Sequence, residues 1–184
     1  MLNRSFLYAA LTVLALCPAV AAVAAQQNGN AKAGGSQVKR LGGAGAWEAY
    51  LDDAQGGKIC YLIGKPKKVE RGRAKADEVR MSVTHRPSDK VANVVNFILG
   101  YRAKKDSDAT LDIDGKKFSL FTDKDGAWTR DAATDRAVVT ALTKGKSAAL
   151  KAAPDHGGPT TDVYDLNGFT ATVALIDKAC GVKR

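Results

Sequence analysis

The chain contains only two histidines, His85 and His156, which are the first candidates for acid–base chemistry. His156 follows Asp155 in a glycine-rich stretch, and an aspartate can orient an imidazole ring as a general base. A hydrolase also needs an activated nucleophile, and the Gly-x-Ser-x-Gly motif that presents one is absent from the sequence. His85 falls in the apolar phase of an alternating segment, so we expect it to be a hydrogen-bonded residue at the edge of the core. The sequence therefore predicts no catalytic residue, and a small periplasmic hydrolase using His156 is the weaker alternative.

The acidic segment Asp123-Lys124-Asp125-Gly126 is a hint of a metal site. A calcium loop of the EF-hand type needs an acidic residue two positions earlier and a glutamate at its end. Those positions hold Phe121 and Ala132, so we interpret the segment as an ordinary turn. The sequence also lacks a glycine-rich phosphate loop, a dinucleotide-binding fingerprint and an HExxH zinc motif. We therefore predict neither a metal nor a cofactor.

Residues 1–25 have the three parts of a signal peptide. Arg4 supplies the positive start, residues 6–16 form an apolar run too short to span a bilayer, and small residues precede a cleavage site. Cys17 lies in a partial lipoprotein motif, and its lipidation is the alternative to cleavage. We expect cleavage, because Pro18 and an alanine cluster interrupt the apolar run. The mature chain would then be exported and would contain no transmembrane segment.

Loss of Cys17 leaves the mature chain with one pair of cysteines, Cys60 and Cys180. An even pair in an exported chain favours a disulfide bond, and two unrelated buried thiols are the alternative. The bond would close a loop of about 120 residues and stabilise the fold by roughly 5 kcal/mol on the chain-entropy model. With no CxxC spacing, the pair is a poor zinc or redox site.

The chain is basic, with 28 lysines and arginines against 19 acids and a formal net charge of +9. Removal of the leader lowers this charge by one unit, and the mature chain still favours anionic partners. A possible polyanion-binding cluster lies between residues 65 and 75. Its members are Lys65, Lys67, Lys68, Arg71, Arg73 and Lys75. Aromatic residues that stack on bases are absent from the cluster, so we do not expect nucleic acid as the partner, and a merely solvated loop is the simpler alternative.

The elements that must position these residues are mostly strands. Residues 26–45 are rich in glycine, asparagine and alanine and predict a flexible linker, followed by one domain over residues 46–184. Alternation predicts strands over residues 47–51, 59–63 and 78–85, and residues 91–99 are apolar on both faces, which is typical of a central strand covered on both sides. Asp114-Gly115 predicts a tight hairpin within residues 111–121. Aromatic residues at strand positions, including Trp47 and Tyr164, are expected in the core or in cross-strand pairs.

The last third of the chain changes period. Val138, Ala141 and Leu142 have helical spacing, Asp131 or Thr134 provides an N-cap, and a stop is expected at residues 144–145. Residues 160–166 predict another strand. Residues 169–180 fit either a strand or a helix by their spacing alone.

Short motifs follow one another in a fixed order along this domain. They are residues 47–50 (WEAY), 60–61 (CY), 82–87 (SVTHRP), 93–95 (NVV), 100–101 (GY), 113–122 (IDGKKFSLFT), 127–128 (AW), 164–171 (YDLNGFTA) and 179–180 (AC). In their order and spacing, from about residue 46 onward, the chain resembles the invasion-associated locus B (IalB) family of exported proteins, found mainly in alphaproteobacteria. The chain departs from the family pattern at residues 155–162, which leaves the role of that loop open.

The resemblance implies a mainly β fold, an immunoglobulin-like β-sandwich with one or two short helices in the C-terminal third, and it favours a helix over residues 169–180. It also implies a periplasmic, secreted or outer-surface location in a Gram-negative bacterium, an association with host-cell invasion, and no catalytic residues. The expected function is that of a non-enzymatic envelope protein acting on an unknown protein or on an anionic envelope or host-surface partner, in invasion or envelope upkeep. The alternative is a polyanion-binding module for lipopolysaccharide or glycans. The sequence predicts no oligomeric state.

Overall fold

The computed structural model describes residues 38–54, 56–70 and 79–184, which belong to one compact unit, Gly34–Arg184. The expected signal peptide with Cys17 lies outside the described residues, as do Arg71, Arg73 and Lys75 of the basic cluster. The strands are β1 (Val38–Ala44), β2 (Trp47–Ala54), β3 (Gly57–Gly64), β4 (Lys68–Glu70), β5 (Arg80–Arg86), β6 (Val91–Ile98), β7 (Asp108–Ile113), β8 (Lys116–Asp123), β9 (Gly126–Trp128), β10 (Ser147–Ala152) and β11 (Thr160–Asp165). The helices are α1 (Ala132–Lys144) and α2 (Phe169–Cys180), with a short 3₁₀ turn at Pro87–Asp89.

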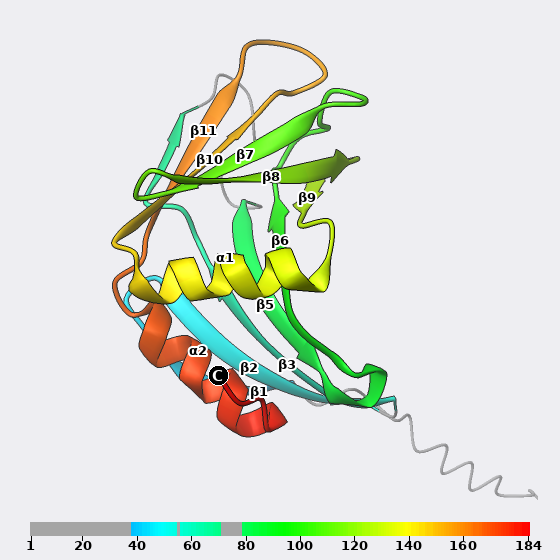
Figure 1. Ribbon diagram of the computed structural model, residues 1–184, viewed down its shortest axis with the longest axis vertical. Coiled ribbons are helices and arrows are strands. Elements are labelled where there is room, and N and C mark those ends of the chain that lie inside the picture. The colour runs from blue at the N-terminus through cyan, green and yellow to red at the C-terminus, as the bar shows by residue number, and fades with distance from the viewer. Residues whose placement is uncertain (1–37, 55, 71–78) are drawn as a thin grey trace, which may run out of the picture. The chain divides into compact units, whose positions relative to one another are not determined.

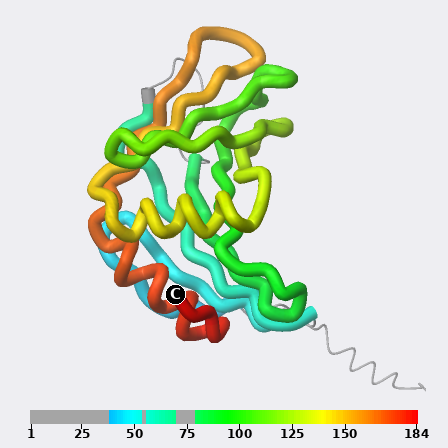
Figure 2. Tube along the Cα trace, in the orientation of Figure 1, coloured from blue at the N-terminus to red at the C-terminus, as the bar shows by residue number. Residues whose placement is uncertain are grey.

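Hydrogen bonds join the described strands into one antiparallel sheet in the order β1-β2-β3-β5-β6-β9-β8-β7-β10-β11-β4. We call β1, β2, β3, β5 and β6 the first half-sheet, and β8, β7, β10, β11 and β4 the second half-sheet. The strand direction turns between β6 and β8 (Figure 1), and the short strand β9 connects the two half-sheets. Figure 2 shows the same arrangement as a backbone trace.

One core lies between the two half-sheets. Tyr164 of β11 is fully buried and contacts Trp47 of β2 and Phe97 of β6, with ring centroids 6.3 and 5.8 Å apart. The indole N–H of Trp47 also donates to the carbonyl of Asp165 at 2.9 Å. Side chains of both half-sheets therefore bury one another, which is the packing of a sandwich. The mainly β class and the sandwich-like arrangement agree with the expectation.

The two helices cover the inner side of the first half-sheet (Figure 1). In α1, Asp131 caps the N-terminus by accepting from Thr134 N at 2.7 Å, as predicted. The buried Asp135 of α1 accepts from Val95 N at 2.8 Å and from the Thr129 hydroxyl, which fastens the helix to β6. Burial raises the pKa of Asp135, and these two hydrogen bonds oppose that rise.

Helix α2 packs on β1, β2 and β3. Its spacing alone left residues 169–180 open between helix and strand, and the helix implied by the family resemblance is confirmed. Phe169, Val173 and Ile176 form its buried face, and Gly181 ends it in the left-handed conformation. The expected hairpin is also confirmed, because Asp114 and Gly115 both have positive φ between β7 and β8.

Two expectations are corrected by the structure. The flexible linker was expected to reach residue 45, but β1 occupies its last part and pairs with β2, with Leu41 and Gly42 against the core and α2. Residues 26–37 of the expected linker lie outside the described residues. Strand β6 was expected to be covered on both faces, but only one face is, since Val95 and Phe97 are buried while Val94 and Ile98 are partly exposed. Packing of α2 orders β1, and the two helices cover only one face of β6.

Candidate functional site

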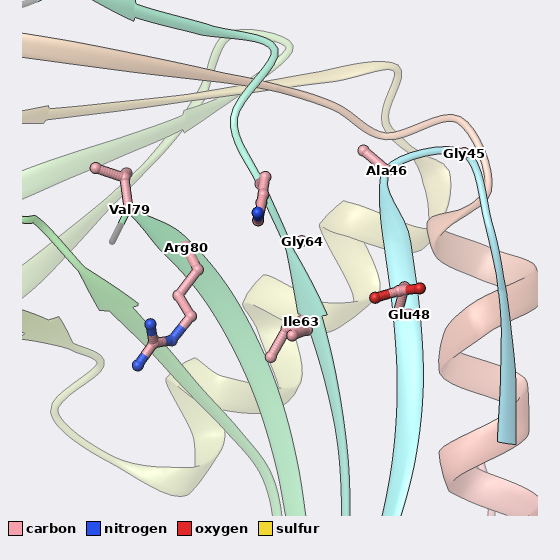
Figure 3. A pocket seen from close by; sticks show the side chains of 8 residues that line it. Gly45, Ala46, Glu48, Ile63, Gly64, Val79 and Arg80 are labelled. Atoms are coloured by element: carbon pink, nitrogen blue, oxygen red, sulfur yellow. The ribbon is translucent and has the colours of Figure 1, made fainter. Parts of the chain in front are cut away.

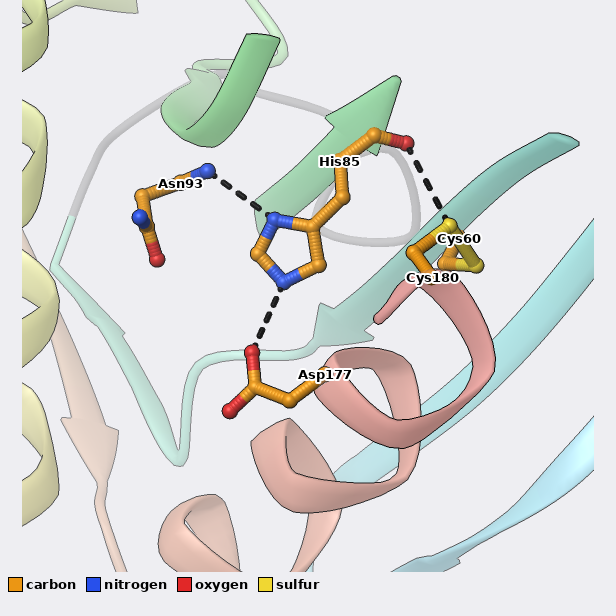
Figure 4. The surroundings of a disulfide bond; sticks show 5 residues. All are labelled: Cys60, His85, Asn93, Asp177 and Cys180. Carbon is orange, nitrogen blue, oxygen red and sulfur yellow. Dashed lines mark hydrogen bonds and ion pairs between the residues drawn. A yellow bond between two sulfur atoms is a disulfide. The ribbon is translucent and has the colours of Figure 1, made fainter. Parts of the chain in front are cut away.

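A disulfide bond joins Cys60 of β3 to Cys180 at the end of α2 (Figure 4). The two Cα atoms are 6.0 Å apart and 120 positions apart in the sequence. Cys60 is fully buried and lies opposite His85 in the register of β3 and β5. The bond therefore ties the last helix to the middle of the first half-sheet and closes most of the domain into one loop.

His85 lies beside this bond, fully buried, with both ring nitrogens engaged (Figure 4). Its Nδ1 accepts a hydrogen bond from the backbone N–H of Asn93 at 2.9 Å, so the ring proton must reside on Nε2. Nε2 then donates to Asp177 Oδ1 at 3.0 Å. The predicted hydrogen-bonded histidine is confirmed, although it lies inside the core rather than at its edge. An imidazole held and enclosed in this way orders the interior and does not face a substrate.

Asp177 links this histidine to the surface. Its carboxylate also accepts from Arg184 Nε at 2.6 Å and from Arg184 Nη2 at 2.8 Å. Burial on its own would raise the pKa of Asp177, but the hydrogen bonds from His85 and Arg184 outweigh burial and lower it. The carboxylate is therefore charged at neutral pH and paired on both sides, as a buried charge must be.

His156 lies in the loop between β10 and β11, and its side chain is 93% exposed. Its Nε2 is 3.8 Å from Asp155 Oδ2, which is an ion-pair distance rather than a hydrogen bond. Thr160, the next hydroxyl residue along the chain, is buried and bonded to Tyr101 and to the carbonyl of Ala152. The loop therefore presents an exposed imidazole but turns its hydroxyl group inward.

The segment Asp123–Gly126 forms a turn between β8 and β9, with Lys124 in the left-handed region at φ 51°. Within residues 38–54, 56–70 and 79–184 no group of three or more His, Cys, Asp or Glu residues has the arrangement of a metal site. Over the same part of the chain, no helix has the length and apolar character needed to cross a bilayer.

The outer side of the first half-sheet, which faces away from the helices, carries a shallow groove of about 480 Å³. Glu48, Ile63 and Arg80 project from three neighbouring strands into it (Figure 3). The Tyr50 hydroxyl donates to Glu48 at 2.7 Å and, with Arg40, lowers the pKa of that carboxyl. The groove therefore combines one carboxylate with cations around an aliphatic floor.

Beside the groove, Tyr50 and Tyr61 stack across β2 and β3 with ring centroids 5.3 Å apart. Phe121 and Trp128 stack in the same manner across β8 and β9, at 5.6 Å. The expectation that aromatic residues form core contacts or cross-strand pairs is confirmed at these positions and at Trp47.

The predicted basic cluster divides between two places. Lys65 lines the groove of the first half-sheet. Lys67 and Lys68 line a separate hollow of about 510 Å³ on the second half-sheet, where Lys146 joins them. Arg71, Arg73 and Lys75 lie outside the described residues, so their part in the cluster stays a prediction.

Sequence reasoning missed Asp177, Arg184 and Lys146. A signal for Asp177 was present, because it is four positions after Val173, on the buried face of a helix where an acid needs a partner. No comparable signal exists for Lys146, whose neighbours Lys67 and Lys68 are about 80 positions away and meet it only through strand pairing.

Comparison with known proteins identifies the family. A family model described as invasion associated locus B (IalB) protein matches residues 47–177. The match covers β2 to β11 and most of α2. No curated protein and no solved structure matches the chain. The IalB family is not known as an enzyme family. The chain belongs to the invasion-associated locus B family.

Proposed function

We propose that this chain is an exported, non-enzymatic protein that acts at the cell envelope by binding a protein partner through the outer side of its first half-sheet, in host-cell invasion or envelope upkeep. Family membership supports an envelope or secreted protein. The disulfide between Cys60 and Cys180 supports export, because such bonds persist in oxidising compartments.

The composition of the outer side of the first half-sheet is the observation that carries the proposal. Side chains alternate between the two faces of each strand, so Leu62 of β3 and Val83 of β5 are buried under the helices. The residues next to them in each strand face outward. The large apolar side chains on the outward face are only partly buried; they are Tyr50, Ile59, Tyr61, Ile63, Val94 and Ile98. Tyrosine and aliphatic residues with charged groups around them are the composition of protein interfaces.

The edge of this half-sheet is less suited to a partner. Strand β1 pairs only with β2 among the described strands, but Lys39 and Arg40 are exposed on it and a register shift lies between Arg40 and Gly42. Charged residues and bulges on an edge strand oppose the addition of another strand. Binding through the face is therefore favoured over binding by strand addition.

Photo-crosslinking in living cells tests this proposal. A photoreactive phenylalanine analogue placed at Tyr61 should give a discrete adduct with a partner protein in the envelope fraction. The same analogue at Lys178, an exposed position of α2 on the helix side, should not give that adduct. Identical adducts from both positions, no adduct at Tyr61, or retention of the mature protein in the cytosol would refute the proposal.

A further inference from the structure

Three lysines from two distant parts of the chain surround one hollow on the second half-sheet. Lys67 is the residue before β4, Lys68 is the first residue of β4, and Lys146 is the residue before β10. The remaining lining residues are Ser147, Val163, Tyr164 and Asp165, and the volume is about 510 Å³. A cavity of this size accommodates the polar head of a small ligand.

Strand register explains why these residues meet. Strand β11 lies between β10 and β4 in the sheet, with Val163 opposite Lys68 and Asp165 opposite Ser147. Residues directly opposite each other point to the same side of a sheet. The buried Tyr164 points to the other side and forms the floor with its backbone.

Lysines outnumber carboxylates among the described residues that line the hollow. Asp165 is the carboxylate among the lining residues, and it already accepts from Asn167 N at 2.9 Å and lies 3.7 Å from Lys67 Nζ. Asp114 lies nearby, but its oxygens accept from the backbone N–H groups of Lys146 and Ser147 at 2.7 and 3.1 Å. Among the described residues that line the hollow, three lysines and the exposed Ser147 therefore surround one carboxylate, which is already engaged.

We propose that this hollow binds a phosphate monoester group, carried by an envelope lipid or by a free phosphorylated molecule. A lysine ammonium is a compact point charge that donates to phosphate oxygens. A phosphate monoester carries close to two negative charges near neutral pH, as a phosphorylated side chain does, which suits several cations around one point. The hydroxyl of Ser147 adds a neutral donor at the same place.

The inference goes beyond the proposed function, because the hollow and the protein-binding face lie on different strands. Substitution of Lys146 leaves the outer side of the first half-sheet unchanged. Failure of phosphate binding and failure of crosslinking at Tyr61 are therefore separate results. The same substitution also separates this site from a general attraction of anions to the basic segment near residue 70, since Lys146 lies outside that segment.

The test compares Lys146→Gln with Lys151→Gln in the full disulfide-bonded protein. Lys151 is an exposed lysine of the same strand β10, and it does not line the hollow. Binding is measured with inorganic phosphate by NMR shifts of backbone amides. It is also measured by co-sedimentation with phosphatidylcholine vesicles that contain either phosphatidic acid, a monoester, or phosphatidylglycerol, a diester.

In the wild-type protein, phosphate should shift the NMR signals of the Ser147 and Lys68 amides, or the protein should bind phosphatidic acid vesicles more tightly than phosphatidylglycerol vesicles. Amide shifts with inorganic phosphate would show that a free phosphorylated molecule can bind the hollow. Binding only to the phosphatidic acid vesicles would show that the ligand is a lipid headgroup. Lys146→Gln should weaken the binding about five-fold, the usual effect of one lysine at an anionic surface, and Lys151→Gln should leave it unchanged. Equal losses in the two variants, equal binding to both kinds of vesicle without phosphate shifts, or no binding to any probe would overturn the proposal.

Discussion

Replacement of Asp177 by alanine is a direct test of the buried network behind the disulfide. The substitution leaves the Nε2–H group of the fully buried His85 without its acceptor, which costs about 1–3 kcal/mol. The lost contacts with Arg184 add little, since that side chain is 32% exposed and water can replace the carboxylate. We expect the free energy of unfolding to fall by about 2–3 kcal/mol.

Urea unfolding at neutral pH, followed by tryptophan fluorescence with the disulfide intact, measures this loss. Lys178→Ala is the matched control, because Lys178 is the next residue of α2 and is exposed. A surface substitution of this kind should change the free energy of unfolding by no more than about 0.5 kcal/mol. If Asp177→Ala were no more destabilising than Lys178→Ala, the buried network would not stabilise the fold.

The same residue predicts how stability depends on pH. The pKa of Asp177 is lower in the fold than its ordinary value of 3.8. Such a group stabilises the fold above the unfolded-state pKa, and the stabilisation is lost as the pH falls through the folded-state pKa. Below a pH of about 4, the wild type should therefore lose stability more steeply than Asp177→Asn, in which the group does not titrate. Parallel curves for the two proteins would contradict the lowered pKa.

Three further predictions concern packing, capping and the covalent link. Gly64→Ala should destabilise the fold by about 1–3 kcal/mol and lower the Tm, because the added methyl group would lie 2.2 Å from the buried ring of Trp47. Asp131→Ala should cost about 1 kcal/mol in urea unfolding, because α1 loses its N-cap acceptor. Removal of the disulfide by Cys60→Ala with Cys180→Ala should cost about 3–5 kcal/mol in the same assay, as expected for a closed loop of 120 residues.

Each of these predictions has a control. Gly158→Ala adds a methyl group in open space, so it should leave the Tm unchanged, and an equal loss in both glycine variants would refute the packing argument. Asp131→Ser keeps a side-chain acceptor and should retain most of the stability that alanine removes. Chemical reduction of the wild type should destabilise it about as much as the double alanine substitution does. A stable reduced protein would contradict the role given to the bond.

The features that could be predicted from the sequence depend on local chemistry. Asp114-Gly115 suits a hairpin by its tolerance of positive φ, and Asp131 caps a helix by its own side chain, so neither needs distant contacts. The disulfide followed from counting, since the expected mature chain has only Cys60 and Cys180 to pair.

The features that could not be predicted depend on contacts between distant segments. Strand β1 has a composition typical of a linker, and it is ordered by pairing with β2 and by the contact of Gly42 with Leu175 of α2. The hollow beside Lys146 depends on the order β10-β11-β4, in which β4 pairs with β11 and not with β3 or β5, the strands next to it in the sequence. Sequence pattern predicts the existence of strands, and the order in which they pair is a property of the whole fold.

The redox state of the two cysteines in living cells tests the central claim most directly, namely that this is an exported domain closed by one covalent bond. Cells are quenched in acid, free thiols are alkylated, and the mature protein is examined by mass spectrometry. We predict that Cys60 and Cys180 are unmodified before reduction and are both alkylated after it. Alkylation of both residues without reduction would contradict the account.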